Sequence, residues 1–478
     1  MVFSGIPFLF YYLPILLLVY FAVPASHRHA RNLVLLIASL LFYAWGEGLY
    51  VLLLLFSITI NHKIAQRLLT QNKTALIVGV IVNLGLLAWY KYAGFAAQSL
   101  GFNHWQAPPL PLGISFFTFQ SISYLVDVYR KQAKPASSFI ESALYISSFP
   151  QLIAGPIVRY KHVAEQIFSR TESFAQFNLG IRFFIIGLAQ KVLIANLVGE
   201  TADAAFGAVP QELNALAAWI GLLAYGLQIY FDFAGYSNMA LGLGHMLGFK
   251  FPRNFDTPYS AQSITLFWRR WHMTLSEWFR DYLYIPLGGN RGGTAVTIFN
   301  LWLVFILCGL WHGAAWTFIL WGAWHGLFLS IERVGLGRLL LRLWQPLRHL
   351  YLLVVVFLAW VLFRAESIRH ALDYYAALFG LNSNSSDALP FLFNPQTAAM
   401  LALSLILATS LPSRFISLFK STLSTKPFAS MPSQTELTPA LDSAFITSIY
   451  YLSLFAVFVL CVAALVSNTY NPFIYFRF

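Results

Sequence analysis

The chain has 478 residues, of which 58% are hydrophobic and only 10% are Asp, Glu, Lys or Arg. A soluble domain carries about 25% charged residues, so this composition excludes an ordinary soluble protein and indicates a chain embedded in a membrane. The formal net charge of +12 does not point to nucleic acid, because the basic residues lie in short loops between apolar runs. Such loops are typical of the cytoplasmic side of membrane proteins.

Thirteen apolar runs are candidates for membrane-spanning helices, which need about 20 residues each. They lie at residues 7–24, 32–46, 48–61, 75–90, 110–126, 138–154, 177–199, 214–231, 294–311, 314–331, 350–363, 396–412 and 446–467. Several are too short for a full crossing, so we estimate about ten to twelve crossings. The first run lacks the basic stretch of a secretory signal, and we expect it to be retained.

Two pairs of runs are separated by only one or two residues. These pairs, 32–46 with 48–61 and 294–311 with 314–331, are expected to form tilted or re-entrant hairpins, which are tolerated where protein or a cavity surrounds them.

Basic clusters follow the first, third and fifth runs, so both termini are predicted outside the cytoplasm. The cluster at Arg159 and Lys161 fits this orientation less well.

The segment 250–293 is the longest stretch that is neither apolar nor linker-like. Residues 267–282 mix aromatic and charged side chains at helical spacing, which predicts an amphipathic helix at the membrane interface. A Gly- and Pro-rich stretch at 286–293 ends it. The later loop at 413–443 is rich in Ser, Thr and Pro, and we expect a flexible cytoplasmic connection there.

Four arginines of this segment have two interpretations, which the sequence leaves open. Guanidinium groups bind phosphate with two hydrogen bonds, so they could hold the phosphates of an activated acyl donor. Alternatively they follow the excess of basic residues in cytoplasmic loops and pair with Glu277 and Asp281. The four are Arg269, Arg270, Arg280 and Arg291.

Two histidines, His312 and His325, lie inside the most apolar region, each in a Trp-His-Gly sequence. Ionisable residues at membrane depth usually mark a function, and a neutral imidazole can accept a proton from a hydroxyl group. The alternative is a histidine that only joins two helices by a hydrogen bond. Neither these two histidines nor His272 belongs to a metal-binding motif with closely spaced ligands, such as His-Glu-x-x-His. We therefore predict no metal site.

Three further polar residues stand in apolar surroundings: Gln151, Gln228 and Asp232. Polar side chains of this kind often join helices inside a bundle, and that interpretation is favoured over a role in lining a tunnel. No Gly-x-Ser-x-Gly nucleophile motif occurs.

The chain resembles the membrane-bound O-acyltransferases, and within them the alginate O-acetyltransferase subfamily. The resemblance extends over nearly the whole chain and rests on motifs in a fixed order. They lie at residues 1–4, 111–116, 153–156, 230–237, 267–272, 280–285, 288–293, 309–313, 321–326 and 473–478.

This resemblance implies one membrane-embedded all-helical domain over residues 1–478, with a central funnel and the family's histidine at its thinned centre. That role maps to His312, with His325 as second candidate. The residues that we predict to bind the donor, from the basic and aromatic pattern, are Arg269, Arg270, His272, Arg280, Asp281, Asn290 and Arg291. The resemblance also implies a multi-pass protein of the bacterial inner membrane that binds no cofactor. An acyl group, by default from acetyl-CoA, would pass to a polysaccharide acceptor through a periplasmic SGNH-type acetyltransferase partner.

The C-terminal motif has two interpretations. Its aromatic residues follow Asn471-Pro472, a turn signal, and are typical of an anchor at the membrane interface. The motif also resembles the end of small accessory proteins in teichoic acid D-alanylation, which implies that Tyr475 carries the acyl group. A phenol, with a pKa near 10, is a better leaving group than a sugar alcohol.

Two other functions are compatible with a polytopic chain. A polysaccharide transporter or flippase would place the polar residues along a pathway, but the paired inverted halves typical of transporters are not found in the sequence. An O-acyltransferase for lipid or protein, from another branch of the family, differs only in its acceptor.

Overall fold

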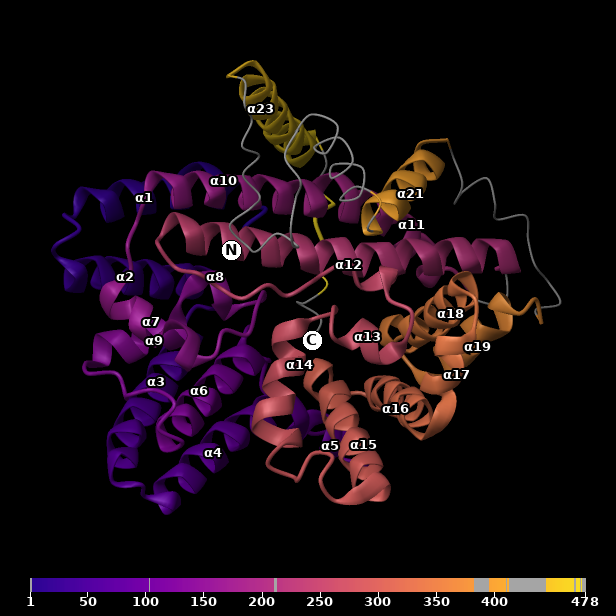
Figure 1. The fold of residues 1–478 in the computed structure, drawn as a ribbon, viewed down its shortest axis with the longest axis horizontal. Coiled ribbons are helices and arrows are strands. Elements are labelled where there is room, and N and C mark those ends of the chain that lie inside the picture. The colour runs from indigo at the N-terminus through magenta and orange to yellow at the C-terminus, as the bar shows by residue number, and fades with distance from the viewer. Residues whose placement is uncertain are drawn as a thin grey trace.

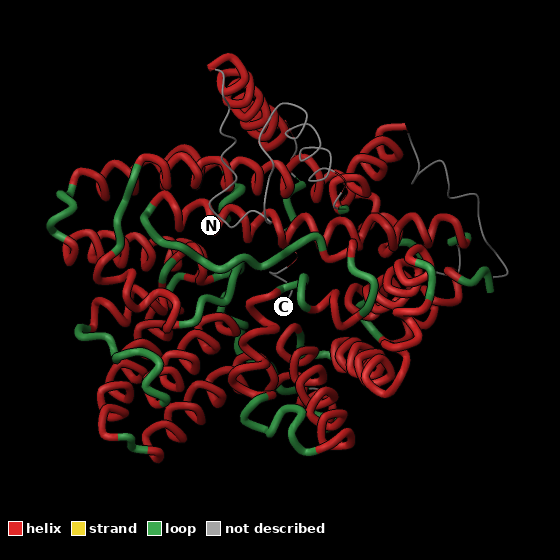
Figure 2. Tube along the Cα trace, viewed as in Figure 1, coloured by secondary structure: helices red, strands yellow, loops and turns green. Residues whose placement is uncertain are grey.

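The computed structural model describes residues 2–102, 104–209, 213–381, 395–409, 411, 444–467, 470–472 and 474. Every regular element in these ranges is a helix, as Figure 2 shows in red. The prediction of an all-helical chain is confirmed for the described residues. Tyr475 and the loop predicted at 413–443 lie outside them.

The first half of the chain leads up to one very long helix, α12. The elements are η1 (Phe8–Tyr12), α1 (Leu13–Ala22), α2 (Arg28–Glu47), α3 (Tyr50–Arg67), η2 (Leu68–Thr70), α4 (Lys73–Leu87), η3 (Ala88–Tyr92), α5 (Ala93–Ser99), α6 (Ile114–Tyr129), α7 (Phe139–Ser147), α8 (Phe149–Leu152), α9 (Tyr160–Ser169), α10 (Phe174–Ala189), η4 (Gln190–Ala195), α11 (Asn196–Gly207) and α12 (Ala215–Met246).

The second half begins with the segment rich in basic and aromatic residues and continues into a helical hairpin. Its elements are η6 (Pro258–Ser260), α13 (Ile264–Trp268), α14 (Met273–Phe279), η7 (Arg280–Tyr284), α15 (Gly293–His312), α16 (Trp316–Ile331), η8 (Glu332–Leu336), α17 (Gly337–Arg342), α18 (Gln345–Arg364), α19 (Ile368–Leu378), α21 (Pro395–Ala408) and α23 (Ala444–Ser467).

Six helices in the described ranges are long and apolar enough to cross a membrane. Two are built from consecutive elements, Lys73–Ser99 from α4, η3 and α5, and Phe174–Gly207 from α10, η4 and α11. The others are α12, α15, α18 and most of α23. The estimate of ten to twelve crossings also counted shorter runs, which the structure forms as shorter helices such as α1 and α16. A polytopic helical membrane protein is thus confirmed.

Two predicted elements are interrupted. The run at 138–154 is not one helix, because α7 ends at Ser147 and the chain turns at Ser148, just before Pro150. Proline cannot donate a main-chain hydrogen bond and disrupts a continuing helix. The single amphipathic helix predicted at 267–282 is also wrong. It is divided into α13 and α14 at His272, which has a left-handed φ of +42°.

Two of the basic loops contact segment 250–293. Arg159 pairs with Glu277 at 2.5 Å and also with Asp281. Arg130 donates to the main-chain oxygen of Asp281 at 3.0 Å. The cluster at Arg159, which fitted the predicted orientation less well, therefore lies on the same face as segment 250–293.

Helices α10 and α12 lie side by side along the length of the molecule (Figure 1). Two pairs of glycines allow their main chains to approach closely, Gly180 with Gly242 and Gly187 with Gly235. A Cβ atom at Gly187 would lie 2.4 Å from the main-chain oxygen of Gly235. Small residues at such contacts are a common basis of helix packing in membranes.

This contact predicts that Gly187→Ala destabilises the protein. The added methyl group meets main chain that cannot move aside, and overpacking of this kind typically costs about 1–3 kcal/mol. We expect a lower apparent melting temperature in detergent. Gly85→Ala is the matched control, because a Cβ atom there meets nothing within 4 Å and alanine favours a helix over glycine. Equal effects of the two substitutions would contradict the packing argument.

Candidate active site

His312 is the last residue of α15, and its side chain lies in an aromatic cage. The residue is 3% exposed. Its ring packs edge-on against Trp321 at 5.1 Å and Phe363 at 5.2 Å between centroids, and against Trp311 at 5.0 Å. The helix ends there because the chain becomes extended at Gly313. The cage excludes water and lipid from an ionisable ring at the end of a membrane-spanning helix.

The hairpin of α15 and α16 holds this cage together. A Cβ atom at Gly309 would lie 2.1 Å from the main-chain oxygen of Phe318, and one at Gly322 would lie 2.2 Å from that of Phe305. The two glycines therefore allow the helices to touch at the main chain. The predicted hairpin at 294–311 and 314–331 is confirmed, with its turn directly after His312.

His325 lies in α16 and is fully buried. The indole nitrogen of Trp268 donates a hydrogen bond to His325 Nδ1 at 3.3 Å. Since an indole can only donate, Nδ1 is the acceptor, and in the neutral ring Nε2 carries the proton. Trp321 separates the two histidines, with its ring 5.0 Å from that of His325. The acceptor nitrogen of His325 is already used in this bond, which argues against His325 as the proton acceptor.

His272 approaches His312 from a third direction, with 6.4 Å between the ring centroids. The side-chain oxygen of Asn254 holds the strained turn at His272. It lies 3.0 Å from His272 Nδ1 and accepts bonds from the hydroxyl of Thr274 at 2.8 Å and its main-chain N–H at 3.3 Å. A left-handed non-glycine residue persists only where its surroundings enforce it, and often at functional sites. Asn254 thus divides α13 from α14 and directs His272 toward the cage.

Two side chains of the π-helical turn η3 donate hydrogen bonds to the last main-chain carbonyl groups of α15. Tyr92, in η3, donates its hydroxyl to Leu310 O at 2.9 Å. Lys91 donates to Trp311 O at 2.5 Å and to the hydroxyl of Ser115 at 3.0 Å. Helix ends leave main-chain carbonyls unpaired, and single π-helical turns often occur at functional sites. Lys91 and Tyr92 therefore fix the end of the helix that presents His312.

A cavity of about 370 Å³ lies directly beyond the cage. Phe363 belongs to both, since its ring contacts His312 on one side and lines the cavity. The lining residues come from α11, α12, α16, α18 and the C-terminal segment. They are Asp203, Tyr225, Gln228, Ala315, Thr317, Phe318, Phe363, Arg364, Ala365, Glu366, Pro472 and Ile474.

The three predicted tunnel residues are found in different surroundings. Gln228 lines the cavity, and its side-chain oxygen has no hydrogen-bond partner among the described residues. Gln151 donates to Tyr145 O at 2.6 Å, which agrees with a helix-joining role. Asp232 forms an ion pair with Lys191 at 2.7 Å and is not among the residues that line the cavity.

The predicted donor-binding residues do not form one group. His272 lies buried beside His312, whereas Arg269, Arg280, Asn290 and Arg291 are exposed and Arg270 and Asp281 are half-buried. The guanidinium of Arg280 pairs with Asp281 at 2.7 Å. Burial raises the pKa of the Asp281 carboxyl. The neighbouring positive charges of Arg280, Arg159 and Lys161 lower that pKa by a larger amount, so it lies below its ordinary value. This pairing favours a structural role for Arg280, while Arg269, Arg270 and Arg291 remain candidates for phosphate binding.

Among the described residues, no three His, Cys, Asp or Glu side chains are grouped as metal ligands would be. Cys308 and Cys461 are both free and buried.

Sequence reasoning did not identify Lys91, Lys191 or Asn254. Lys91 is the only Asp, Glu, Lys or Arg between Lys73 and Asp127, and such isolated charges in apolar runs indicate function. The isolated charge of Lys91 was therefore a signal from which the sequence could have identified this residue. Nothing in the sequence around Asn254 marks it as important. Its role comes from the turn at His272 that it stabilises, and His272 lies 18 residues away in the chain.

If Lys91 holds the end of α15, Lys91→Met should slow the acyl transfer that the sequence predicts. Small displacements of a reacting group are costly, so we expect roughly a 10- to 100-fold lower kcat with the donor KM unchanged. Turnover of purified protein in proteoliposomes measures both. Lys63→Met, at an exposed lysine of α3, is the control, and unchanged turnover in Lys91→Met would contradict the positioning role.

Comparison with known proteins agrees with this site. The model of the MBOAT, membrane-bound O-acyltransferase family, matches residues 114–372, more than half of the chain and including both histidines. The chain is 42% identical to the probable alginate O-acetylase AlgI of Pseudomonas aeruginosa, over 80% of this chain and 76% of that protein. It is 40% identical to the probable alginate O-acetylase AlgI of Azotobacter vinelandii, over the full length of both.

The chain is also similar to a relative named for a different substrate. The peptidoglycan O-acetyltransferase of Helicobacter pylori is 36% identical over 79% of this chain and 80% of its own length. The resemblance inferred from the motifs is therefore confirmed, and a transporter is not supported. The chain is an O-acyltransferase that belongs to the membrane-bound O-acyltransferase family.

Proposed function

We propose that this protein moves an acetyl group from a cytoplasmic donor, by default acetyl-CoA, across the bacterial inner membrane for O-acetylation of an exported or cell-envelope polysaccharide such as alginate. A separate periplasmic SGNH-type acetyltransferase completes the transfer to the polymer. The similarity to alginate O-acetylases of Pseudomonas and Azotobacter and to a peptidoglycan O-acetyltransferase of Helicobacter supports an envelope polysaccharide as acceptor.

One observation carries the proposal: the ring of His312 contacts two different parts of the structure. One is His272, in the segment that also bears the exposed arginines. The other is Phe363, which lines the 370 Å³ cavity. A donor bound at the exposed arginines and an acceptor in the cavity would therefore meet at one imidazole, with bulk water excluded by the cage.

The chemistry follows from a neutral imidazole in this position. His312 accepts the proton of the attacking hydroxyl as its oxygen bonds to the acetyl carbonyl carbon of the thioester. The tetrahedral intermediate collapses by breaking the carbon–sulfur bond, and the leaving thiolate takes the proton back from the imidazolium. Proton transfer of this kind contributes typically about 10²–10⁴-fold to a rate. His325 supports the cage through Trp321 rather than taking the proton.

This assignment predicts unequal effects of two substitutions. His312→Ala should lower acetyl transfer by about 10²–10⁴-fold, the contribution of a proton acceptor, without changing membrane insertion. His325→Ala should lower it less, because it only loosens the cage. Transfer or hydrolysis of radiolabelled acetyl-CoA by purified protein measures both. A His312→Ala variant that keeps half of the activity, or the reverse order of the two, would contradict the assignment.

The acceptor hydroxyl is proposed to be that of Tyr475, which then passes the acetyl group to the periplasmic partner. Tyr475 lies outside the described residues, but its neighbour Ile474 lines the cavity. The phenol loses its proton to His312 and becomes an acetyl ester, which a serine of the partner can attack. The competing interpretation is an aromatic anchor at the membrane interface.

Tyr475→Phe separates the two interpretations, since it keeps the aromatic ring and removes only the hydroxyl. We expect loss of polymer acetylation in cells, and an acetylated C-terminal peptide in the parent protein by mass spectrometry. Tyr11→Phe, the same change at a tyrosine 66% exposed on η1, is the matched control. Normal acetylation in Tyr475→Phe would favour the anchor.

A further inference from the structure

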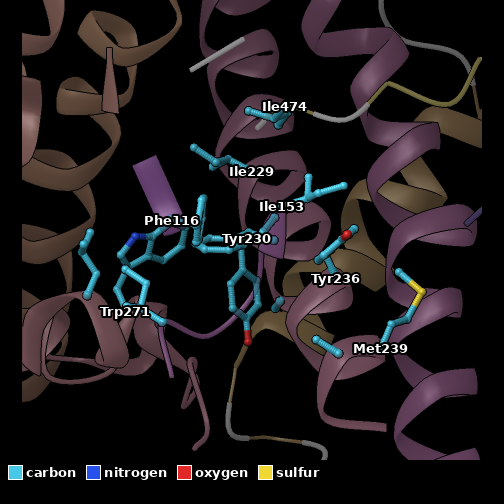
Figure 3. Packing of buried hydrophobic residues seen from close by; sticks show 14 of the residues in the cluster. Phe116, Ile153, Ile229, Tyr230, Tyr236, Met239, Trp271 and Ile474 are labelled. Atoms are coloured by element: carbon cyan, nitrogen blue, oxygen red, sulfur yellow. The ribbon is translucent and has the colours of Figure 1, made fainter. Parts of the chain in front are cut away.

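The C-terminal segment enters the interior of the protein, and its residues 470–472 are not helical. Pro472 and Ile474 line the cavity, and Ile474 is 8% exposed and part of the buried hydrophobic cluster in Figure 3. A non-helical main chain at membrane depth is tolerated only where protein satisfies its polar groups. The segment therefore requires donors and acceptors from the surrounding helices.

Two buried, oppositely charged side chains supply them. Lys191 of η4 donates to the main-chain oxygen of Pro472, and Asp232 of α12 accepts from the main-chain N–H of Ile474 at 3.0 Å. The two side chains form an ion pair with each other at 2.7 Å, and both residues are at most 2% exposed. The pair thus presents one donor and one acceptor to main-chain groups two residues apart.

Neighbouring contacts fix the same segment through its side chains. The Asn471 amide donates to Ser4 O at 3.3 Å, and its oxygen accepts from Asn196 at 3.3 Å. Tyr470 donates its hydroxyl to Asp203 at 2.7 Å, and Asp203 pairs with Arg364. Asn471 thereby joins the C-terminal segment to Ser4, near the start of the chain.

We propose that Lys191 and Asp232 are positioning residues that bind the main chain of the protein's own C-terminal segment and hold it as one wall of the cavity beside His312. A pair that served only to join η4 to α12 would need no second bond from each partner to the same short segment. The effect on activity rests on the proposed function, whereas the binding of the segment does not.

The decisive variant is the double substitution Lys191→Met and Asp232→Asn. Either single change leaves one charge buried without its partner, which is strongly destabilising by itself. The double variant keeps the side-chain volumes, removes both charges and lacks the lysine donor. Asn238→Ala is the matched control, because Asn238 of α12 bonds to Gln190 of η4 at 2.8 Å without a contact to the segment.

Hydrogen–deuterium exchange of the C-terminal peptide in nanodiscs gives a readout that needs no activity. We expect exchange at least tenfold faster in the double variant, and acetyl transfer with a kcat at least tenfold lower and an unchanged donor KM. Asn238→Ala should leave both near those of the parent protein.

Unchanged exchange in the double variant, or equal acceleration in Asn238→Ala, would overturn the binding role. Faster exchange with unchanged transfer would overturn the positioning role. If the parent protein itself transfers no acetyl group, the proposed function fails, and the exchange rates still decide whether the pair binds the segment.

Discussion

Polar groups at membrane depth must find their partners inside the protein, because hydrocarbon offers none. The structure around His312 depends on this constraint. The last carbonyls of α15 bond to Lys91 and Tyr92, and His325 bonds to Trp268. Each bond joins elements far apart in the chain, so satisfying the polar groups also fixes the relative positions of the helices. The hydrogen bonds of the neighbouring groups therefore fix the position of the His312 ring.

The same constraint explains why the site is built where the helices are broken. The strained turn at His272 and the C-terminal residues 470–472, which are not helical, both expose main-chain groups. Asn254 holds the first, and Lys191 with Asp232 holds the second. Both breaks lie next to the aromatic cage or the cavity beyond it. Regular helices give the body its shape, and the interruptions lie around one histidine, His312.

The sequence predicted the parts whose signal is local. His312 and His325 are ionisable residues within apolar, Trp- and Gly-rich runs, and the hairpin that carries them follows from two runs and a short turn. Long-range partners could not be predicted in this way. Lys91 and Trp311 are 220 positions apart, and the break at His272 depends on Asn254 rather than on the helical spacing around it. Asp232 stands out in the sequence as a charged residue in an apolar run. Its partners, Lys191 of η4 and the main chain of Ile474, could not be predicted from that run.

The most direct test of the role of His312 is a structure of the protein with a non-hydrolysable acetyl-CoA analogue. We expect the pantetheine arm to pass His272 and the acetyl carbonyl carbon to lie beside His312, close enough for a hydroxyl in the cavity to attack at about 3–3.5 Å. An analogue whose acetyl end lies at His325, or stays among the exposed arginines away from the cage, would contradict it.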